Sequence, residues 1–183
     1  MALARYGVYR KIDVARMIWF AEFSRFTKIL PTNQSPDIRI NADTLQKSPR
    51  SMNNIEEFLK ASTFAVAGAS RDRSKYGNKV FRAIVGTGRN VYPLNPTAPE
   101  VEGATAYASI TVLPAVPESL SIVTPPTVTR QVIQQAIAAG VKNIWMQPGA
   151  EDAKGSQAAR DAGLNVIDDG SCILVLLARE NRG

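Results

Sequence analysis

Five short apolar runs alternate with segments of helical periodicity between residues 62 and 169, and this alternation limits the folds that the chain can adopt. The runs read STFAVAGA, NVYPLNP, SLSIVTPP, KNIWMQPG and LNVIDD. Apolar runs bounded by glycine, proline or polar residues are typical of strands buried on both faces of a sheet. Apolar residues recur at helical spacing over about 75–87, 128–139 and 150–163, and a short capped helix is expected over 53–60.

The order of these segments predicts an α/β protein. Such alternation usually gives a parallel sheet covered by helices on both faces, with right-handed crossovers. We therefore expect a Rossmann-like three-layer fold with a mostly parallel sheet of five or six strands. Residues 97–114 are rich in turns, and the sequence does not decide whether the last apolar segment, SCILVLLA, is helix or strand.

Ligands of open α/β sheets bind beyond the carboxyl ends of the strands, so the residues that follow each strand form the candidate site. These five corners are Gly68 to Ser70, Asn95 to Thr97, Thr124 to Pro126, Gln147 to Gly149, and Asp168 to Cys172. Their glycines and prolines give tight turns and allow a ligand to approach the backbone closely. Asp168 and Asp169 are the one acidic pair, and neighbours in a strand point to opposite faces. The corners therefore favour binding over catalysis.

The first corner carries the clearest signal for an anion. Gly68 allows a ligand to reach the backbone, Ser70 supplies a hydroxyl, and the helix that begins near Lys75 presents free N–H groups and a positive dipole end. The loop also contains three cations that suit phosphates, which are Arg71, Arg73 and Lys75. No G-x-G-x-x-G pattern is present, and Asn95 stands where an acidic residue would hold the ribose of a dinucleotide. NAD(P) binding is thus disfavoured, but it stays open as an alternative.

The composition excludes several kinds of active site. Histidine is absent, which removes Ser–His and Cys–His nucleophile pairs and the commonest zinc ligand. Cys172 is the single cysteine, so the chain forms no internal disulfide and fits a reducing, cytoplasmic compartment. No apolar run approaches the roughly 18 residues that a membrane span requires. We expect neither a metal site nor autonomous catalysis.

The net charge of +6 lies mostly in the first 51 residues, which hold nine Lys and Arg but only four Asp and Glu. This segment has no regular period and is rich in Pro, Ser and Asn near its end, so we predict a basic, disordered leader over residues 1–51. The expected folded domain covers residues 52–183, and Met52 is a candidate start of the native protein. A nucleic-acid-binding fold would carry the basic excess itself, so nucleic acid is not expected as a partner.

Long stretches of the predicted domain resemble a known family. VAGASRDRSKYGNKVFRAI, VYPLNPTAPEVEGATAYASI, the segment from Thr124 to Ile167 and the late Cys172 are similar in order and spacing to the small stand-alone CoA-binding domain proteins. These proteins resemble the CoA-binding N-terminal domain of the succinyl-CoA synthetase alpha subunit. The similarity covers about residues 54–175. It implies a Rossmann-like fold with CoA or an acyl-CoA lying across the strand ends.

The resemblance also assigns residues to the ligand. Near the CoA phosphates or adenosine it places Gly68, Ala69, Ser70, Arg71, Ser74, Lys75 and Tyr76, with Asn95, Pro96 and Thr97 beside the adenosine. Along the pantetheine path it places Pro125, Pro126, Gln147, Pro148 and Gly149, with Cys172 near the thiol. Thr97 stands where the family often has a lysine, which leaves recognition of the 3′-phosphate open. The synthetase's phosphorylated histidine lies in a domain without a counterpart in this sequence, so the resemblance implies no ligase activity for this chain alone.

Three alternatives to a CoA-binding protein without catalysis remain on the sequence alone. They are the NAD(P)- or nucleotide-binding subunit of an oxidoreductase, a thiol-redox carrier in which Cys172 pairs with CoA, and a nucleic-acid-associated protein acting through its leader. A lone cysteine beside an apolar segment is also common as a small buried hydrophobe. A protein partner and a homo-oligomer both stay open.

Overall fold

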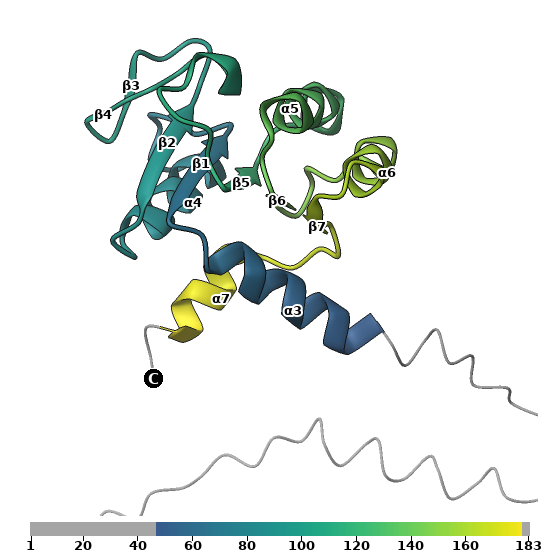
Figure 1. The fold of residues 1–183 in the computed structure, drawn as a ribbon. Helices are drawn as coiled ribbons and strands as arrows, with labels where there is room; N and C mark the ends of the chain where they lie inside the picture. The colour runs from purple at the N-terminus through teal and green to yellow at the C-terminus, as the bar shows by residue number, and fades with distance from the viewer. Residues whose placement is uncertain (1–46, 181–183) are drawn as a thin grey trace, which may run out of the picture. The chain divides into compact units, whose positions relative to one another are not determined.

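The computed structural model describes residues 47–180, and residues 1–46 of the predicted leader lie outside the described residues (Figure 1). The helices are α3 Lys47–Leu59, α4 Tyr76–Val85, α5 Pro126–Ala139, α6 Ala153–Asp161 and α7 Ile173–Glu180, with a short 3₁₀ helix η1 at Ile110–Val112. The strands are β1 Thr63–Ala67, β2 Asn90–Leu94, β3 Glu100–Val101, β4 Ala104–Thr105, β5 Ser119–Ile122, β6 Asn143–Met146 and β7 Asn165–Ile167.

The structure extends one predicted helix and decides the type of the last apolar segment. α3 begins at Lys47, ahead of the expected start at residue 53, and so takes in residues 47–51, which we assigned to the leader. The last apolar segment forms the helix α7, in which Ile173 and Leu177 are buried while Val175 between them is 49% exposed. A strand would place all three on one face, whereas a helix separates Val175 from the other two. Within residues 47–180, no helix is both long and apolar enough to cross a membrane.

The main sheet consists of five parallel strands in the order β2-β1-β5-β6-β7. This confirms the predicted Rossmann-like α/β fold, with five strands in the main sheet. β3 and β4 form a separate antiparallel hairpin within the turn-rich segment. β2 lies on one side of β1, and β5, β6 and β7 follow in order on the other side. The carboxyl ends of β1 and β5 are therefore the switch point of the sheet, where ligands of such folds bind.

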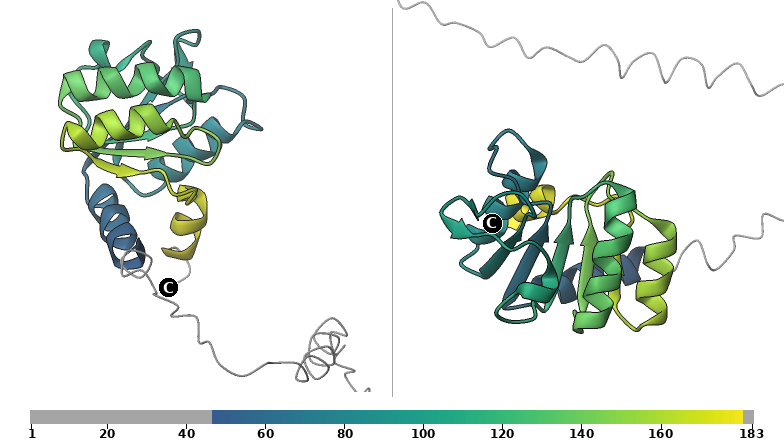
Figure 2. Two further views of the ribbon diagram at one scale, coloured as in Figure 1. Left: turned by 90° about the vertical axis from the view of Figure 1, so that its right-hand side faces the viewer. Right: turned by 90° about the horizontal axis from the view of Figure 1, so that it is seen from above.

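Helices cover both faces of the sheet. α5 and α6 lie over one face, and α3, α4 and α7 lie over the other (Figure 2). Successive side chains of β1 point to opposite faces, so Phe64 and Val66 pack with α3, α4 and α7, whereas Ala65 and Ala67 pack with α5 and α6. Burial on both faces explains why this strand is an uninterrupted apolar run in the sequence.

An aromatic contact anchors α3 to the sheet. The ring centroid of Phe58 lies 5.5 Å from that of Phe64 and 5.2 Å from that of Trp145, both edge to face. All three side chains are fully buried. The hydroxyl of Ser119 donates to the carbonyl oxygen of Phe58 over 3.0 Å. α3 is therefore part of the domain core, and Trp145 is a core residue.

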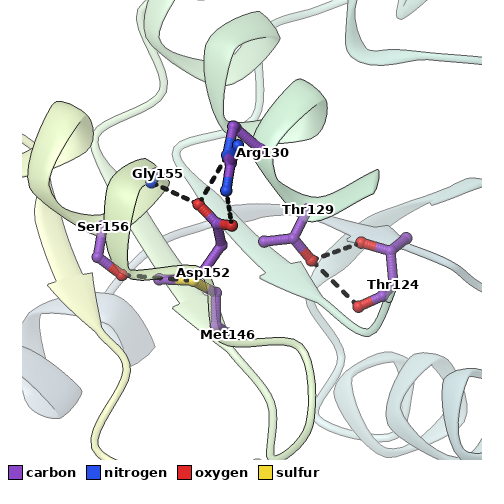
Figure 3. A network of polar contacts seen from close by, with 7 residues as sticks. All are labelled: Thr124, Thr129, Arg130, Met146, Asp152, Gly155 and Ser156. Carbon is purple, nitrogen blue, oxygen red and sulfur yellow. Dashed lines mark hydrogen bonds and ion pairs between the residues drawn. The ribbon is translucent and has the colours of Figure 1, made fainter. Parts of the chain in front are cut away.

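Side-chain contacts join the amino-terminal ends of α5 and α6 (Figure 3). Arg130 Nε donates to Asp152 Oδ1 over 3.0 Å, and its Nη2 donates to Oδ2 over 2.6 Å. Asp152 Oδ1 also accepts the N–H of Gly155 at 2.7 Å and so caps α6. The hydroxyls of Thr129 and Thr124 lie 2.9 Å apart, and Thr129 also donates to the Thr124 carbonyl oxygen over 3.0 Å. These contacts fix the positions of the first turns of α5 and α6 relative to the strand ends.

We predict that Asp152→Asn lowers the melting temperature at pH 7, and that this loss becomes smaller as the pH falls towards the folded pKa of Asp152. Hydrogen bonds from Arg130, followed by the Gly155 N–H, hold the pKa of Asp152 below its ordinary value. A carboxyl whose pKa is lowered by folding stabilises the fold above the unfolded pKa of about 4, and this stability is lost as the pH falls through the folded pKa. Thermal unfolding at several pH values measures the effect. Asp161→Asn on the same helix is the control, because its carboxylate contacts the amide of Gln157 and forms no ion pair within residues 47–180. The same loss at every pH in both variants would contradict the prediction.

Candidate ligand site at the sheet switch point

A glycine ends β1 beside the end of β5. The N–H of Gly68 donates to the carbonyl oxygen of Leu94 over 3.1 Å, and Gly68 has a φ of 87°. A Cβ atom at this position would lie 3.2 Å from the carbonyl carbon of Val123 and from Cγ2 of Thr124. A side chain would therefore be strained both by the left-handed backbone and by the lack of space. Gly68 allows the end of β1 to lie close against Val123 and Thr124 at the end of β5.

A second glycine, Gly77, sets the distance between α4 and β1. We did not predict this role from the sequence. A Cβ atom on Gly77 would lie 2.0 Å from the carbonyl oxygen of Gly68 and 3.0 Å from its carbonyl carbon. Any side chain here would push the first turn of α4 away from the end of β1. A glycine in the first turn of a predicted helix is the signal that could have revealed it, because glycine is a poor helix former and needs a packing reason there.

The loop between β1 and α4 is held by its own side chains. Ser70 Oγ accepts the N–H of Asp72 at 3.1 Å, and Asp72 Oδ1 accepts the N–H of Ser74 at 2.9 Å and its hydroxyl at 2.7 Å. The hydrogen bonds from Ser74 lower the pKa of Asp72. The hydroxyl proton of Ser74 is thus used inside the loop, whereas Arg71 and Lys75 are exposed at its surface.

The third cation of the first corner, Arg73, is paired with a carboxylate. Its Nε lies 3.1 Å from Oε1 of Glu102 and its Nη2 lies 3.0 Å from Oε2. The buried Asn78 donates from Nδ2 to Glu102 Oε1 and to the carbonyl oxygen of Ser70, both over 2.8 Å. The hydrogen bond from Asn78, followed by the contact with Arg73, lowers the pKa of Glu102. Glu102 thus joins the β3–β4 hairpin to the first corner.

The helices that follow β1, β5 and β6 differ in how their amino-terminal ends are capped. Lys75 before α4 and Pro125 before α5 make no side-chain capping hydrogen bond. Asp152 before α6 does make one. The first N–H groups of a helix have no partner within the helix, and together with the helix dipole they attract anions. The two uncapped ends are those that follow β1 and β5, the strands of the switch point.

The corner after β2 is closed by Asn95. Its Nδ2 donates to the carbonyl oxygen of Ala69 over 2.7 Å and so ties this corner to the first one. Its Oδ1 accepts the N–H and the hydroxyl of Thr97, both at 2.9 Å, and the N–H of Ala98 at 3.0 Å. The protein therefore uses both ends of this amide itself, and Pro96 and Thr97 are the exposed residues of the corner.

Three of the predicted site residues, from distant parts of the chain, meet at Tyr76. The Tyr76 hydroxyl donates to Gln147 Oε1 over 3.3 Å and lies 2.8 Å from the sulfur of Cys172, which is 96 positions away in the sequence. Gln147 is fully buried, and its Oε1 also accepts the N–H of Ile173 at 3.0 Å. Its Nε2 has no hydrogen-bond partner among the described residues. Burial, followed by the contact with Cys172, raises the pKa of Tyr76, so the phenol stays protonated.

The other predicted residues lie at the turns around this edge. Pro125, Pro126, Pro148 and Gly149 are exposed, and the N–H of Gly149 donates to Oε2 of Glu151 over 2.7 Å. The surface has two hollows, the second of which is lined in part by Glu102, the partner of Arg73. One of about 460 Å³ lies beside α3, and one of about 480 Å³ lies between α4 and the β3–β4 hairpin. The candidate site is thus a surface made of turns across the strand ends.

Comparison with known proteins bears on what this edge binds. A family model described as a CoA binding domain matches residues 62–178. The chain belongs to this CoA-binding domain family. The match runs from the residue before β1 into α7, so it includes all five strands of the main sheet and every corner of the candidate site. The recognition of this family from the sequence is confirmed.

One curated protein similar to this CoA-binding domain protein is subunit alpha of the ADP-forming acetate–CoA ligase II from Pyrococcus furiosus. The two are 30% identical over 108 residues, which are 58% of this chain and 24% of the relative. This chain therefore spans about a quarter of the length of that relative.

Solved structures include both small proteins and parts of large ones. A conserved hypothetical protein from Pyrococcus furiosus is 37% identical with a TM-score of 0.59, and the match covers 62% of this chain and 97% of that one. A hypothetical protein from Pyrococcus horikoshii is 27% identical with a TM-score of 0.67, covering 73% and 92%. The dinucleotide-forming acetyl-coenzyme A synthetase 1 of Candidatus Korarchaeum cryptofilum is 29% identical with a TM-score of 0.53, covering 60% of this chain and 26% of the synthetase. The domain thus occurs by itself and within longer chains.

We predict that Gly77→Ala destabilises the domain by about 3 kcal/mol, because its methyl group would meet a backbone oxygen that cannot move independently. Chemical denaturation measures the free energy of unfolding. Gly86→Ala, at the other end of α4, is the matched control, since Gly86 has a φ of −59° and a Cβ there would lie 3.3 Å from the Arg82 carbonyl oxygen. Similar stability of the two variants would show that α4 is not held against β1 by Gly77.

We also predict that Glu102→Gln strengthens the binding of pyrophosphate about threefold at low salt. The glutamine keeps an oxygen for Asn78 but removes the charge that neutralises Arg73, so the first corner becomes more positive. A titration followed by NMR chemical shifts measures the affinity. Glu100→Gln changes the net charge equally on the same hairpin and serves as control. An equal gain in both variants would mean that only net charge matters and that the pairing of Arg73 does not.

Proposed function

We propose that this chain binds CoA, or an acyl-CoA, across the carboxyl ends of β1 and β5 and catalyses no reaction by itself. The observation that carries the proposal is the uncapped end of α4 at the switch point, beside that of α5, in a domain of a CoA-binding family. The end of α5 offers fewer donors, because Pro126 has no N–H and the N–H groups of Val128 and Thr129 donate to the Pro125 carbonyl oxygen. The neighbouring α6, in contrast, is capped by its own Asp152. Free N–H groups at helix ends stabilise the charge of a diphosphate.

The residues at this edge fit the parts of CoA. Gly68 and the first turn of α4 would receive the diphosphate, with charge supplied by Arg71 and Lys75. The pantetheine arm carries amide groups, and the buried Nε2 of Gln147 is a donor without a partner among the described residues. Such a donor is satisfied when it faces a carbonyl oxygen of a ligand. CoA itself supplies a thiol that carries acyl groups as thioesters.

The arrangement favours CoA over NAD(P). Both ligands contain a diphosphate, so the first corner does not separate them. NAD sites hold the ribose with an acidic residue at the end of the second strand. Asn95 stands there, and its Oδ1 already accepts hydrogen bonds from Thr97 and Ala98. The ribose of a dinucleotide would therefore find no available side-chain acceptor in Asn95.

We further propose that the chain supplies CoA to a partner protein in the cytoplasm. The relative from Pyrococcus furiosus is a subunit of a ligase, and this chain matches about a quarter of its length. The chain has no histidine, and the pKa of Tyr76 is raised, so neither supplies a base near neutral pH. Groups for acyl transfer would then come from the partner. The single Cys172 fits a reducing compartment.

Isothermal titration calorimetry of the full chain with CoA, in the presence of a reductant, tests the proposal. We expect CoA and acetyl-CoA to bind and NAD to bind much more weakly. CoA at 100 times its dissociation constant should also stabilise the fold by about 2.7 kcal/mol. Lys75→Gln should weaken CoA binding about tenfold and lower its salt dependence, because a cation near the phosphates is lost. Absence of both heat and stabilisation with CoA would overturn the proposal.

Lys142→Gln is the matched control for the lysine variant. Lys142 is exposed in the turn before β6, at the opposite edge of the sheet, and should leave CoA affinity unchanged. Equal weakening in the two variants would assign the effect to net charge instead of to the first corner. Dephospho-CoA is a useful companion ligand, since Thr97 carries no charge and equal affinity for the two ligands is expected.

A further inference from the structure

CoA binding as proposed leaves one nucleophile at the site without a role. Cys172 is the only cysteine of the chain, is partly exposed and directly precedes α7. Its sulfur lies 2.8 Å from the Tyr76 hydroxyl. We propose, resting on the proposed CoA site, that Cys172 exchanges with CoA disulfide and holds one CoA as a mixed disulfide.

The amide of Gln147 gives a second, independent indication of a ligand beside Cys172. Its Oε1 accepts the Tyr76 hydroxyl, and that hydroxyl contacts the sulfur of Cys172. The Nε2 atom of the same planar amide is buried and has no partner among the described residues. A buried donor without an acceptor is unfavourable. The arm that ends in the CoA thiol contains amide carbonyls, so a ligand whose sulfur reaches Cys172 also brings an acceptor for Gln147.

Cys172 lies at the start of a helix, beside the phenol of Tyr76. The Cys172 carbonyl oxygen accepts the N–H groups of Val175 and Leu176, which places this residue at the amino-terminal end of α7. Negative charge is favoured at such an end. The pKa of Tyr76 is raised, first by burial, so the phenol beside the sulfur stays protonated and adds no negative charge there. The sulfur is also partly exposed, as the attack on a disulfide requires.

The reaction is a thiol–disulfide exchange and requires only CoA disulfide as co-reactant. The thiol of Cys172 gives up its proton, and the resulting thiolate attacks one sulfur of the CoA disulfide. A sulfur–sulfur bond forms between Cys172 and that CoA, and the original disulfide bond breaks. The other CoA leaves as a thiolate and takes up a proton. With one cysteine in the chain, no second protein thiol competes to resolve the product.

Intact-mass spectrometry of the full chain incubated with CoA disulfide tests the inference. We expect a mass gain of one CoA that dithiothreitol reverses and that is absent in Cys172→Ser. The reaction should be at least about tenfold faster than with glutathione disulfide at the same concentration, since binding positions the reacting sulfur. Desulfo-CoA, which lacks the thiol but keeps the rest of the ligand, should slow the reaction by competition.

A second variant tests the part played by Gln147 as a positioning residue. Gln147→Glu keeps an oxygen to accept the Ile173 N–H and the Tyr76 hydroxyl but removes the Nε2 donor. We expect the reaction with CoA disulfide to slow about tenfold, while the reaction with glutathione disulfide slows far less. An equal slowing with both disulfides would mean that Gln147 acts on the cysteine alone and would overturn this assignment.

The outcomes separate this inference from the proposed function. If reduced CoA binds in calorimetry but CoA disulfide reacts no faster than glutathione disulfide, the inference fails and the proposed function stands. If CoA neither binds nor competes, both fail. A fast adduct that desulfo-CoA does not slow would show unselective thiol chemistry and would also overturn the inference.

Discussion

The close contact between the first turn of α4 and the end of β1 determines where this domain can hold an anion. Gly77 brings α4 so near that a Cβ atom would lie 2.0 Å from the carbonyl oxygen of Gly68. With α4 held there, its uncapped end lies beside the end of β1. β1 pairs with β2 on one side and with β5 on the other, so this is the switch point of the sheet. Gly68 in turn lets the end of β1 lie close against Val123 and Thr124. The rest of the candidate site is arranged around these two glycines.

Carboxylates neutralise part of the positive charge around this contact. Asp152 caps α6 and pairs with Arg130, and Glu102 pairs with Arg73, so these carboxylates neutralise cations or helix ends next to the site. Arg71 and Lys75 lie exposed in the first corner, before the uncapped end of α4. Two exposed cations therefore lie at the switch point, in a part of the chain, residues 52–183, whose net charge is only +1.

Local patterns were enough to predict the five strands of the main sheet, the helices α4, α5 and α6, the second half of α3, and the corners, because the alternation of apolar runs is a property of neighbouring residues. The pairing of Arg73 with Glu102 joins residues 29 positions apart, and the contact of Tyr76 with Cys172 joins residues 96 apart. Such contacts depend on how loops lie across the sheet, which periodicity does not encode. The role of Gly77 was missed for a similar reason, since its neighbour is a backbone atom of another element.

The polar groups at the site set limits on the chemistry that it supports. Nε2 of Gln147 is a donor without a partner among the described residues, and the end of α4 has no side-chain cap, whereas the amide of Asn95 is used by the protein itself. The phenol of Tyr76 stays protonated because burial raises its pKa. A base would have to come from a carboxylate, yet Asp72 and Glu102, the carboxylates of the first corner, have pKa values lowered by hydrogen bonds. Lowered pKa values make weak bases at neutral pH. Together, these groups suit the holding of a ligand and a sulfur exchange that needs no separate base.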